Sequence, residues 1–318
     1  MPNKANTENT SATSREYRFS GHQTFPLRIA WIPKAVAEIT AGHDPLTDVD
    51  EGITTLGLGK NMVEALRCWI EAFQIASKNG AIWELTPIGK IIFNPTNGYD
   101  AYLEDTSTCW ILHWLICTNA TAPFFAWECL FNRWPSIEFS STQAIDAFRK
   151  ETEKNAKSLS EVTIKQHFDV FLHSYRLSRG GKGEDHLDSV LSVLGLIREA
   201  GERQGSSGKI ETIYQFDTGY KLSISQQLFT YFIHDWWNKS FPNEQTVPLS
   251  QLINGNRSPG RIFKMQETEI LHRIEDIVHH QPKLFQSDDS TNIRQLRRLQ
   301  VKDGLDDIGA AYIAPRYV

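Results

Sequence analysis

The sequence has few features of secreted or membrane proteins. No apolar run approaches membrane-spanning length, and the apolar stretch at residues 109–117 is both short and interrupted by His113. Residues 1–15 are polar, rich in Asn, Ser and Thr, and lack the apolar segment of a signal peptide. They predict a disordered tail. The chain as a whole predicts a cytoplasmic protein without a membrane partner.

Cysteine is scarce, and its spacing predicts neither disulfides nor a metal site. The four cysteines contain no C-x-x-C pair and lie in apolar helical contexts, so we expect buried free thiols in a reducing compartment. Ten histidines add no zinc-ligand spacing, and His279-His280 is an isolated pair at a predicted helix end. The metal, if there is one, stays unknown from the sequence.

The chain also lacks an excess of basic charge. Its formal net charge is −5, which gives no global attraction to nucleic acid, so DNA binding would need a local basic face. Hydrophobic content of 40% and charged content of 22% are ordinary for a soluble globular protein. With 318 residues the chain can hold two or three modules.

The most informative stretch that is present runs from Gly57 to Trp69. It predicts a polar loop with two glycines that opens into an amphipathic helix, with apolar residues at helical spacing. The apolar stripe consists of Met62, Leu66, Ile70 and Phe73, whereas Lys60, Asn61, Glu64, Arg67 and Glu71 project from the rest of the helix surface.

A turn and a strand follow this helix. Asn79-Gly80 predicts the turn, residues 82–85 have a strand pattern, and Thr86-Pro87 opens another helix. Helix, turn and strand in this order are typical of the second half of a winged helix-turn-helix, which lays one helix along a DNA groove.

The rest of the chain predicts a mainly α fold with small β-hairpins, in which winged helix-turn-helix modules pack through a helical middle. A second winged-helix pattern has a helix over 187–197 and a strand over 211–216, and residues 292–299 predict a basic helix. The expected modules are an N-terminal winged-helix-like module at 16–95, a helical connecting core at 96–156, a second winged-helix-like module at 157–222 and a C-terminal helical module at 223–318.

Two motifs together resemble a known bacterial family. The first is Phe19-Ser-Gly-His-Gln-Thr-Phe25 followed by Arg28, Trp31 and Lys34, and the second is Gly57-x-Gly59-Lys60-Asn61-Met62-Val63 followed by Trp69. They resemble a family long filed as a domain of unknown function and encoded beside sulfur-handling genes for DNA phosphorothioation. Its best-understood branch is the DNA-nicking subunit of single-strand phosphorothioation systems. The resemblance extends from about residue 17 to the C-terminus and is strongest in the two motifs.

Residues 57–61 invite a P-loop interpretation, which fails. Thr54 stands where the first glycine of the motif is required, and Asn61 replaces the Mg²⁺-binding Ser or Thr. A helix N-terminus with glycines, Lys60 and Asn61 is still a suitable binding site for a phosphate group of the DNA backbone. The alternative is a helix start that uses glycine only for its turn.

The first motif has two interpretations as well. A histidine between two aromatic residues, as His22 is, is often a core residue that pins a turn. By resemblance, His22 and Arg28 would instead belong to a cleavage centre, and Ser20 and Gln23 would contact DNA. Lys60, Asn61 and Arg67 would then position the duplex.

No nuclease signature can be located in the sequence. Glu151-x-x-Lys154, His234-Asp235 and Asp288-Asp289 could contribute to a metal site, but each has a simpler structural or solvated interpretation. The glycine cluster at 180–183, with Arg179 and Lys182, predicts a flexible loop that could touch phosphate. The densest basic cluster is Arg294, Arg297 and Arg298, a candidate DNA contact. Arg257 and Arg261 form a second basic pair.

The resemblance therefore implies a DNA-acting component of a phosphorothioation and anti-phage defence system. It would nick one strand, with Mg²⁺ or Mn²⁺ as the expected cofactor, so that sulfur can replace a non-bridging oxygen. Its implied partners besides DNA are a cysteine desulfurase, an ATP-dependent sulfur-activating enzyme and an ATPase, and a homodimer is a further expectation. The alternatives are a non-catalytic winged-helix protein that binds DNA or acts as a scaffold or regulator, and a protein-interaction module.

Overall fold

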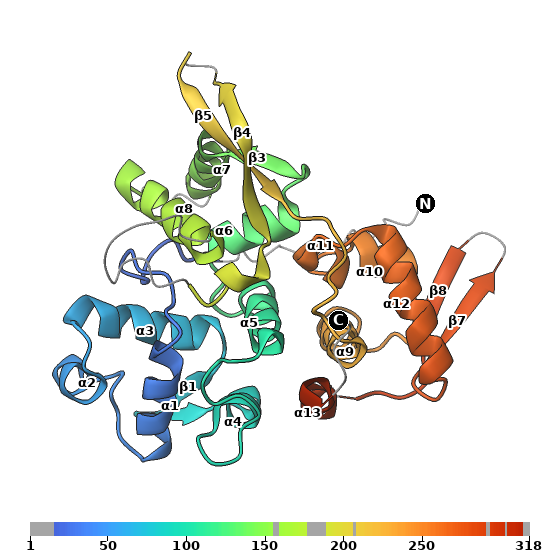
Figure 1. The fold of residues 1–318 in the computed structure, drawn as a ribbon, viewed down its shortest axis with the longest axis horizontal. Helices are drawn as coiled ribbons and strands as arrows, with labels where there is room; N and C mark the ends of the chain where they lie inside the picture. The colour runs from blue at the N-terminus through green and yellow to red at the C-terminus, as the bar shows by residue number, and fades with distance from the viewer. Residues whose placement is uncertain are drawn as a thin grey trace, which may run out of the picture.

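The computed structural model describes residues 16–154, 159–176, 189–205, 208–290, 293–302 and 304–313. The predicted tail at 1–15 and the glycine cluster at 180–183 lie outside these residues. In the described part, helices predominate and three small antiparallel sheets lie among them (Figure 1). The predicted mainly α fold with small β-hairpins is confirmed.

The N-terminal unit follows local sequence signals closely. The Asp48 side chain caps one helix, and Gly57 ends it in a left-handed conformation with φ 64°. The Thr86 side chain accepts the Gly89 N–H and Pro87 fills the first helical position, so a further helix begins there as predicted. The elements are α1 (Trp31–Thr40), α2 (Val49–Leu56), α3 (Lys60–Ala72), β1 (Ala76–Asn79), β2 (Ile82–Leu85) and α4 (Pro87–Phe93).

The middle of the molecule is built around α5 (Thr106–Thr118), which is buried from Ser107 onward. A helix that is apolar on all sides belongs inside a core, and α5 lies between the other parts of the fold (Figure 1). It is followed by α6 (Phe125–Trp127) and a π-helical segment at Glu128–Arg133. The side chains of Trp110, Trp114 and Trp127 are fully buried there.

A second unit combines β3 (Glu138–Ser140), α7 (Ser141–Lys154) and α8 (Glu161–Tyr175) with β4 (Ile197–Gln204) and β5 (Ile210–Phe216) in a sheet of order β3-β5-β4. The predicted strand at 211–216 is therefore confirmed. The predicted helix at 187–197 is wrong for its described residues, which form only a 3₁₀ turn at Ser192–Leu194. Gly195 ends this turn with φ 59°, and Ile197 pairs with Phe216.

The C-terminal unit combines the third sheet, of order β6-β8-β7, with five helices among its described residues. Its elements are α9 (Gln226–Ser240), β6 (Thr246–Pro248), α10 (Leu249–Asn254), α11 (Pro259–Phe263), α12 (Glu267–His280), β7 (Phe285–Ser290), β8 (Ile293–Arg298) and α13 (Leu305–Ile313). The predicted basic helix at 292–299 is wrong, because Ile293–Arg298 form β8. Pairing of β8 with β6 on one side and β7 on the other outweighs the local leucine spacing.

The sheet β3-β5-β4 draws on two of the predicted modules, since β3 lies in the segment 96–156 and β5 in the segment 157–222. The division into modules and the winged-helix assignment stay predictions. The four cysteines are buried and unpaired, as predicted. Among the described residues, none of the helices has the length and apolar character that crossing a membrane requires.

Candidate nucleic-acid interface

The two sequence motifs lie against each other in the structure. Arg18 Nη1 donates a hydrogen bond to Glu71 Oε2 (3.1 Å), and Gln23 Nε2 donates one to Glu64 Oε2 (2.8 Å). Glu64 lies near the beginning of α3 and Glu71 near its end, so the loop at residues 18–24 runs along the helix. We call this loop with α3 the motif face. The proximity of the two motifs could not be read from the sequence, where they are separated by some 30 residues.

The loop of the motif face is tight, and its backbone requires unusual conformations. Gly21 has φ 105°, and a Cβ on this residue would lie 2.9 Å from Cys68 Sγ, so a side chain here would meet both strain and a clash. Gln23 and Thr24 also have positive φ, of 48° and 66°. Consecutive left-handed residues that are not glycine are costly and persist only where the surrounding contacts hold them.

His22 is buried within this loop, with 3% of its surface exposed. Its Nε2 lies 3.1 Å from His167 Nδ1, while the Ala126 N–H donates to His167 Nε2 (3.0 Å). Because His167 Nε2 accepts, its proton is on Nδ1 and is donated to His22 Nε2. Burial, with a smaller contribution from the charge of Arg18, lowers the pKa of His22 to about 4. His22 is therefore neutral at neutral pH.

Aromatic rings surround the His22–His167 pair. The His22 ring centroid lies 5.7 Å from that of Phe124 and 6.2 Å from that of Trp69, and Trp69 Nε1 donates to the Phe25 carbonyl (3.0 Å). These contacts fasten the loop to the core at two points. They favour the interpretation of His22 as a core residue that pins a turn, and the catalytic interpretation stays a prediction.

Arg28 lies at the end of the first motif and is partly buried. Its guanidinium lies over the rings of Phe25 (5.9 Å) and Trp31 (5.7 Å), and its backbone forms a bridge to Ser189. Stacking of this kind fixes the orientation of the side chain.

The N-terminus of α3 is the most exposed part of the motif face. Gly59 is the N-cap and offers no side chain, and the first turn contains no acidic residue. Lys60 and Asn61 are exposed at this positively polarised end, and Arg67 is partly buried further along the helix. Ser20 and Gln23 are exposed on the loop. The structure thus brings together Ser20, Gln23, Lys60, Asn61 and Arg67, which the sequence proposed as DNA contacts.

The arginines of β8 lie far along the chain and have different environments. Arg294 and Arg297 are exposed, whereas only 5% of Arg298 is exposed. Arg298 Nη1 donates to Asn238 Oδ1 (2.9 Å), its Nη2 donates to two backbone carbonyls at the end of α9, and its guanidinium lies 5.3 Å from the Trp237 ring centroid. Arg298 therefore connects β8 to α9 and does not form a surface patch with its neighbours.

The second basic pair is also engaged inside the protein. Arg257 Nη2 lies 2.8 Å from Glu128 Oε2, and both side chains are buried. Nearby cations, Arg257 above all, hold the pKa of Glu128 below its usual value against the opposing effect of burial. Arg261 donates to the carbonyls of Asn132 and Asn254.

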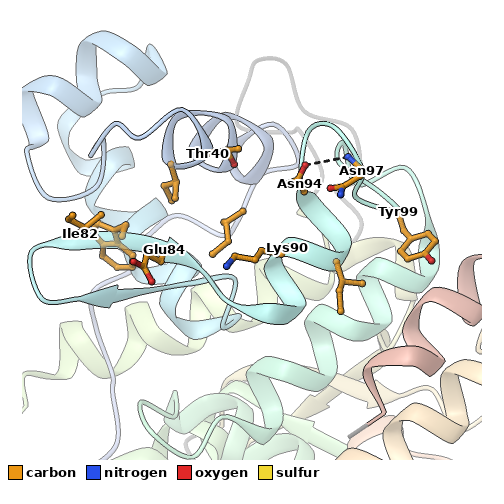
Figure 2. A pocket seen from close by; sticks show the side chains of 11 residues that line it. Thr40, Ile82, Glu84, Lys90, Asn94, Asn97 and Tyr99 are labelled. Atoms are coloured by element: carbon orange, nitrogen blue, oxygen red, sulfur yellow. Dashed lines mark hydrogen bonds between the residues drawn. The ribbon is translucent and has the colours of Figure 1, made fainter.

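A hollow of about 600 Å³ lies between α1, the β1–β2 hairpin and α4 (Figure 2). Lys90 of α4 points toward the hairpin, and the Asn94 side chain accepts the Asn97 N–H (3.3 Å). Ile82 and Tyr99 on its rim are 63% and 49% exposed. The hollow was not predicted from the sequence, because its lining residues come from separate elements. The one local indication was Ile82, an apolar residue directly after the turn at Asn79-Gly80.

The described residues do not present a preformed metal site. They contain no group of three or more His, Cys, Asp or Glu side chains that could hold an ion. Asp235 Oδ2 accepts from Trp114 Nε1 (2.7 Å) and Lys239 (2.8 Å), and Glu151 lies 3.6 Å from Arg133. Asp288 and Asp289 lie on β7. These residues, proposed from the sequence as contributors to a metal site, are divided between the second unit and the C-terminal unit.

The chain belongs to the family described as Protein of unknown function (DUF4007), whose model matches residues 19–309. In particular, its fold is that of SspB. A magnesium ion-bound crystal structure of SspB superimposes with a TM-score of 0.81 and 22% sequence identity, covering 94% of this chain and 90% of that chain. A second SspB crystal structure gives a TM-score of 0.80 with the same identity and coverage. A comparison with curated protein sequences finds no match. The resemblance identified in the two motifs is confirmed.

Proposed function

We propose that this protein is the DNA-binding component of a bacterial DNA phosphorothioation system used in anti-phage defence, and that it nicks one DNA strand to allow sulfur incorporation. The observation that carries this proposal is the similarity to SspB over 94% of the chain, together with the family match. Because the similarity includes all three units, it supports a shared role for the whole chain, and not for one common module alone.

The motif face is the proposed DNA-contacting surface. Its exposed polar groups can donate to phosphate oxygens, and the N-terminus of α3 adds unpaired backbone N–H groups and the helix dipole. The carboxylates of Glu64 and Glu71 are bound to Gln23 and Arg18, so their repulsion of phosphate is reduced. A local surface of this kind is compatible with a net charge of −5.

Cleavage itself is tested directly with supercoiled plasmid and purified protein, in Mg²⁺, in Mn²⁺ and in EDTA. We expect metal-dependent conversion to open circles. Since the described residues offer no cluster of three ligands, the EDTA arm decides whether an ion is needed. Plasmid that stays supercoiled in all arms would contradict the nickase proposal.

A non-catalytic protein that binds DNA or acts as a scaffold is the second candidate. The burial of His22 and the dispersed carboxylates favour it, because both remove groups from a surface cleavage centre. A gel shift that weakens as salt rises, without nicking, would support this candidate.

The partners are proposed on the same similarity. They are a cysteine desulfurase, an ATP-dependent sulfur-activating enzyme and an ATPase, and a homodimer is a further proposal. Light scattering of the purified protein measures the homodimer, and co-purification after joint expression measures each of the other contacts.

A further inference from the structure

Two further hollows lie near the C-terminal end of α3. One, of about 530 Å³, lies between the ends of α5 and α9 and the helix α10, and the other, of about 450 Å³, lies between the end of α3, β1 and residues 119–122. Both are lined by Gln74 and Thr121, so the two hollows adjoin. We call the two together the central groove. It begins where α3 ends and continues to the C-terminal unit.

The central groove has a lysine in each half. Lys78 lines the half beside β1 and Lys239 the half beside α9. Among the described residues, Lys78 donates one side-chain hydrogen bond, to Thr47 Oγ1 (3.2 Å), and Lys239 donates one, to Asp235 Oδ2 (2.8 Å). Since an ammonium group has three donors, each lysine keeps two for a ligand.

Neutral donors lie between and beside the lysines. Ser77, Thr121, Ser240 and Gln251 line the groove with exposed side chains. The one carboxylate in its lining belongs to Glu71, which is bound to Arg18. Hydroxyl, amide and ammonium donors are the groups that bind phosphate oxygens in protein–DNA complexes. The groove therefore suits an extended anionic chain.

Backbone strain occurs in the groove lining. Gln74 and Arg257 both have left-handed conformations, with φ 55° and 53°. Each is held by a buried partner: Gln74 Nε2 donates to the Leu115 carbonyl (3.1 Å), and Arg257 is paired with Glu128. Strained residues that the surrounding structure holds in place cluster at ligand sites.

An aromatic side chain is available beside Lys239. Phe241 is partly buried in the groove lining and packs edge-on against Trp236, with a centroid distance of 5.3 Å. A base can stack on such a ring without regard to its identity, which is how sequence-independent single-strand binders hold DNA.

We propose that the central groove binds a single strand of DNA, with phosphates at Lys78 and Lys239 and a base near Phe241. This inference rests on the proposed function. Hollows of this size between helices admit a strand, whereas a duplex would lie across their rim. The helix α3 has 13 residues and spans about 20 Å, so its exposed N-terminus and the groove at its other end can contact duplex and separated strand at once.

The first test measures binding of a fluorescent oligo-dT strand and of a matched duplex at several salt concentrations. The double variant Lys78→Glu with Lys239→Glu should bind the strand about tenfold more weakly or worse, and the duplex within about twofold of wild type. Loss of two phosphate contacts should also reduce the slope of log affinity against log salt for the strand by about 1.4. The matched control is Lys150→Glu with Lys165→Glu, which makes the same charge change on exposed sites of α7 and α8.

The second test fills the groove without changing charge. Thr121 is exposed where the two hollows meet, and Thr121→Trp should weaken strand binding as strongly as the double lysine variant, whereas Thr121→Ser should leave it unchanged. Thermal unfolding of each variant confirms that the fold is retained.

The outcomes separate the two proposals. If wild type binds duplex and nicks plasmid while the groove variants keep wild-type affinity for the strand, the groove inference is wrong and the proposed function stands. Equal losses in the groove variant and in its control on α7 and α8 would also overturn the groove inference. If wild type binds neither strand nor duplex, both proposals are wrong.

Discussion

The motif face and the strand β8 both carry residues that were predicted to bind or cleave DNA, and the two regions present these residues in different ways. On the motif face, one of these residues, His22, is buried beneath the loop, while Lys60 and Asn61 remain exposed at a helix end. On β8, Arg298 is buried with Leu296 and Arg297 is exposed between them. In a strand, residues two positions apart share a face, so neighbouring arginines separate.

This difference shows that a polar residue in a motif can act on the surface or in the core. His22 and Arg298 both connect segments distant in the chain, His22 to His167 and Arg298 to the end of α9. We therefore expect the buried members of each region to control stability, and the exposed members to control DNA binding.

Arg298→Ala should have the largest effect on stability. It removes a buried cation and leaves Asn238 Oδ1 and two carbonyls without their donor, which should lower the free energy of unfolding by about 3 kcal/mol. Urea denaturation measures this change. Arg297→Ala, on the exposed face of the same strand, is the control and should change stability by less than about 0.5 kcal/mol. Equal losses of stability in the two variants would contradict the claim that the buried and exposed faces of β8 differ in their contribution to stability.

The next effect concerns the pH dependence of stability. The pKa of His22 is lowered from 6.5 to about 4, so between these values the unfolded chain binds a proton that the folded protein does not. The contribution of His22 should be fully present above pH 6.5 and fall by up to about 3 kcal/mol as the pH drops toward 4. In the variant His22→Phe, the free energy of unfolding from urea denaturation should depend less on pH between pH 4 and 6.5 than it does in the wild type. A pH dependence that His22→Phe leaves unchanged would argue that His22 is solvated in the folded state.

A smaller effect is expected at the exposed end of α3. Lys60→Ala with Arg67→Ala should weaken duplex binding by about tenfold, because phosphate contacts supply most of the affinity, while the unfolding free energy changes by less than about 1 kcal/mol. Fluorescence anisotropy with labelled duplex measures the affinity. Lys165→Ala with Lys150→Ala serves as the control on α8 and α7. Unchanged duplex affinity in the Lys60 and Arg67 variant would move the DNA-contacting surface away from the motif face.

The smallest expected effect on stability concerns Thr24, in the loop of the motif face. Thr24 is exposed and has φ 66°, a conformation that a β-branched residue adopts only under strain. Thr24→Gly should raise the free energy of unfolding by about 0.5 kcal/mol if relief of this strain exceeds the entropy that glycine adds to the unfolded chain. Thermal denaturation measures the shift. A loss of stability would mean that contacts of the Thr24 side chain outweigh its strain.

Much of the N-terminal unit could be predicted because its signals are local. Thr86-Pro87 marks a helix start through one hydrogen bond and one fixed φ, and Gly59 precedes the apolar stripe of α3. The predicted helices at 187–197 and 292–299 both failed because of contacts outside the local pattern or a turn within it. In both segments apolar residues fit a helix locally, but Gly195 ends the first after a 3₁₀ turn, with Ile197 paired to Phe216, and pairing with β6 and β7 makes the second a strand.

The candidate site was predictable only in part for the same reason. Lys60 and Asn61 are exposed because of where they lie on their own helix, which periodicity indicates. Nothing near His22 in the chain indicates that its ring nitrogen meets His167, 145 residues away. The central groove could not be predicted at all, because its lining comes from the ends of α3, α5 and α9, which are far apart in the sequence.

By itself the sequence determined the helical character of the chain, the helix at Lys60, the turn, strand and helix that follow it, and the family. These depend on residue spacing and on capping within a few positions. Only the tertiary structure decided which polar residues are buried, which strand pairs with β8 and where the central groove lies. Burial and strand pairing depend on partners brought together by the packing of the whole chain, and the same local pattern is compatible with several such partners.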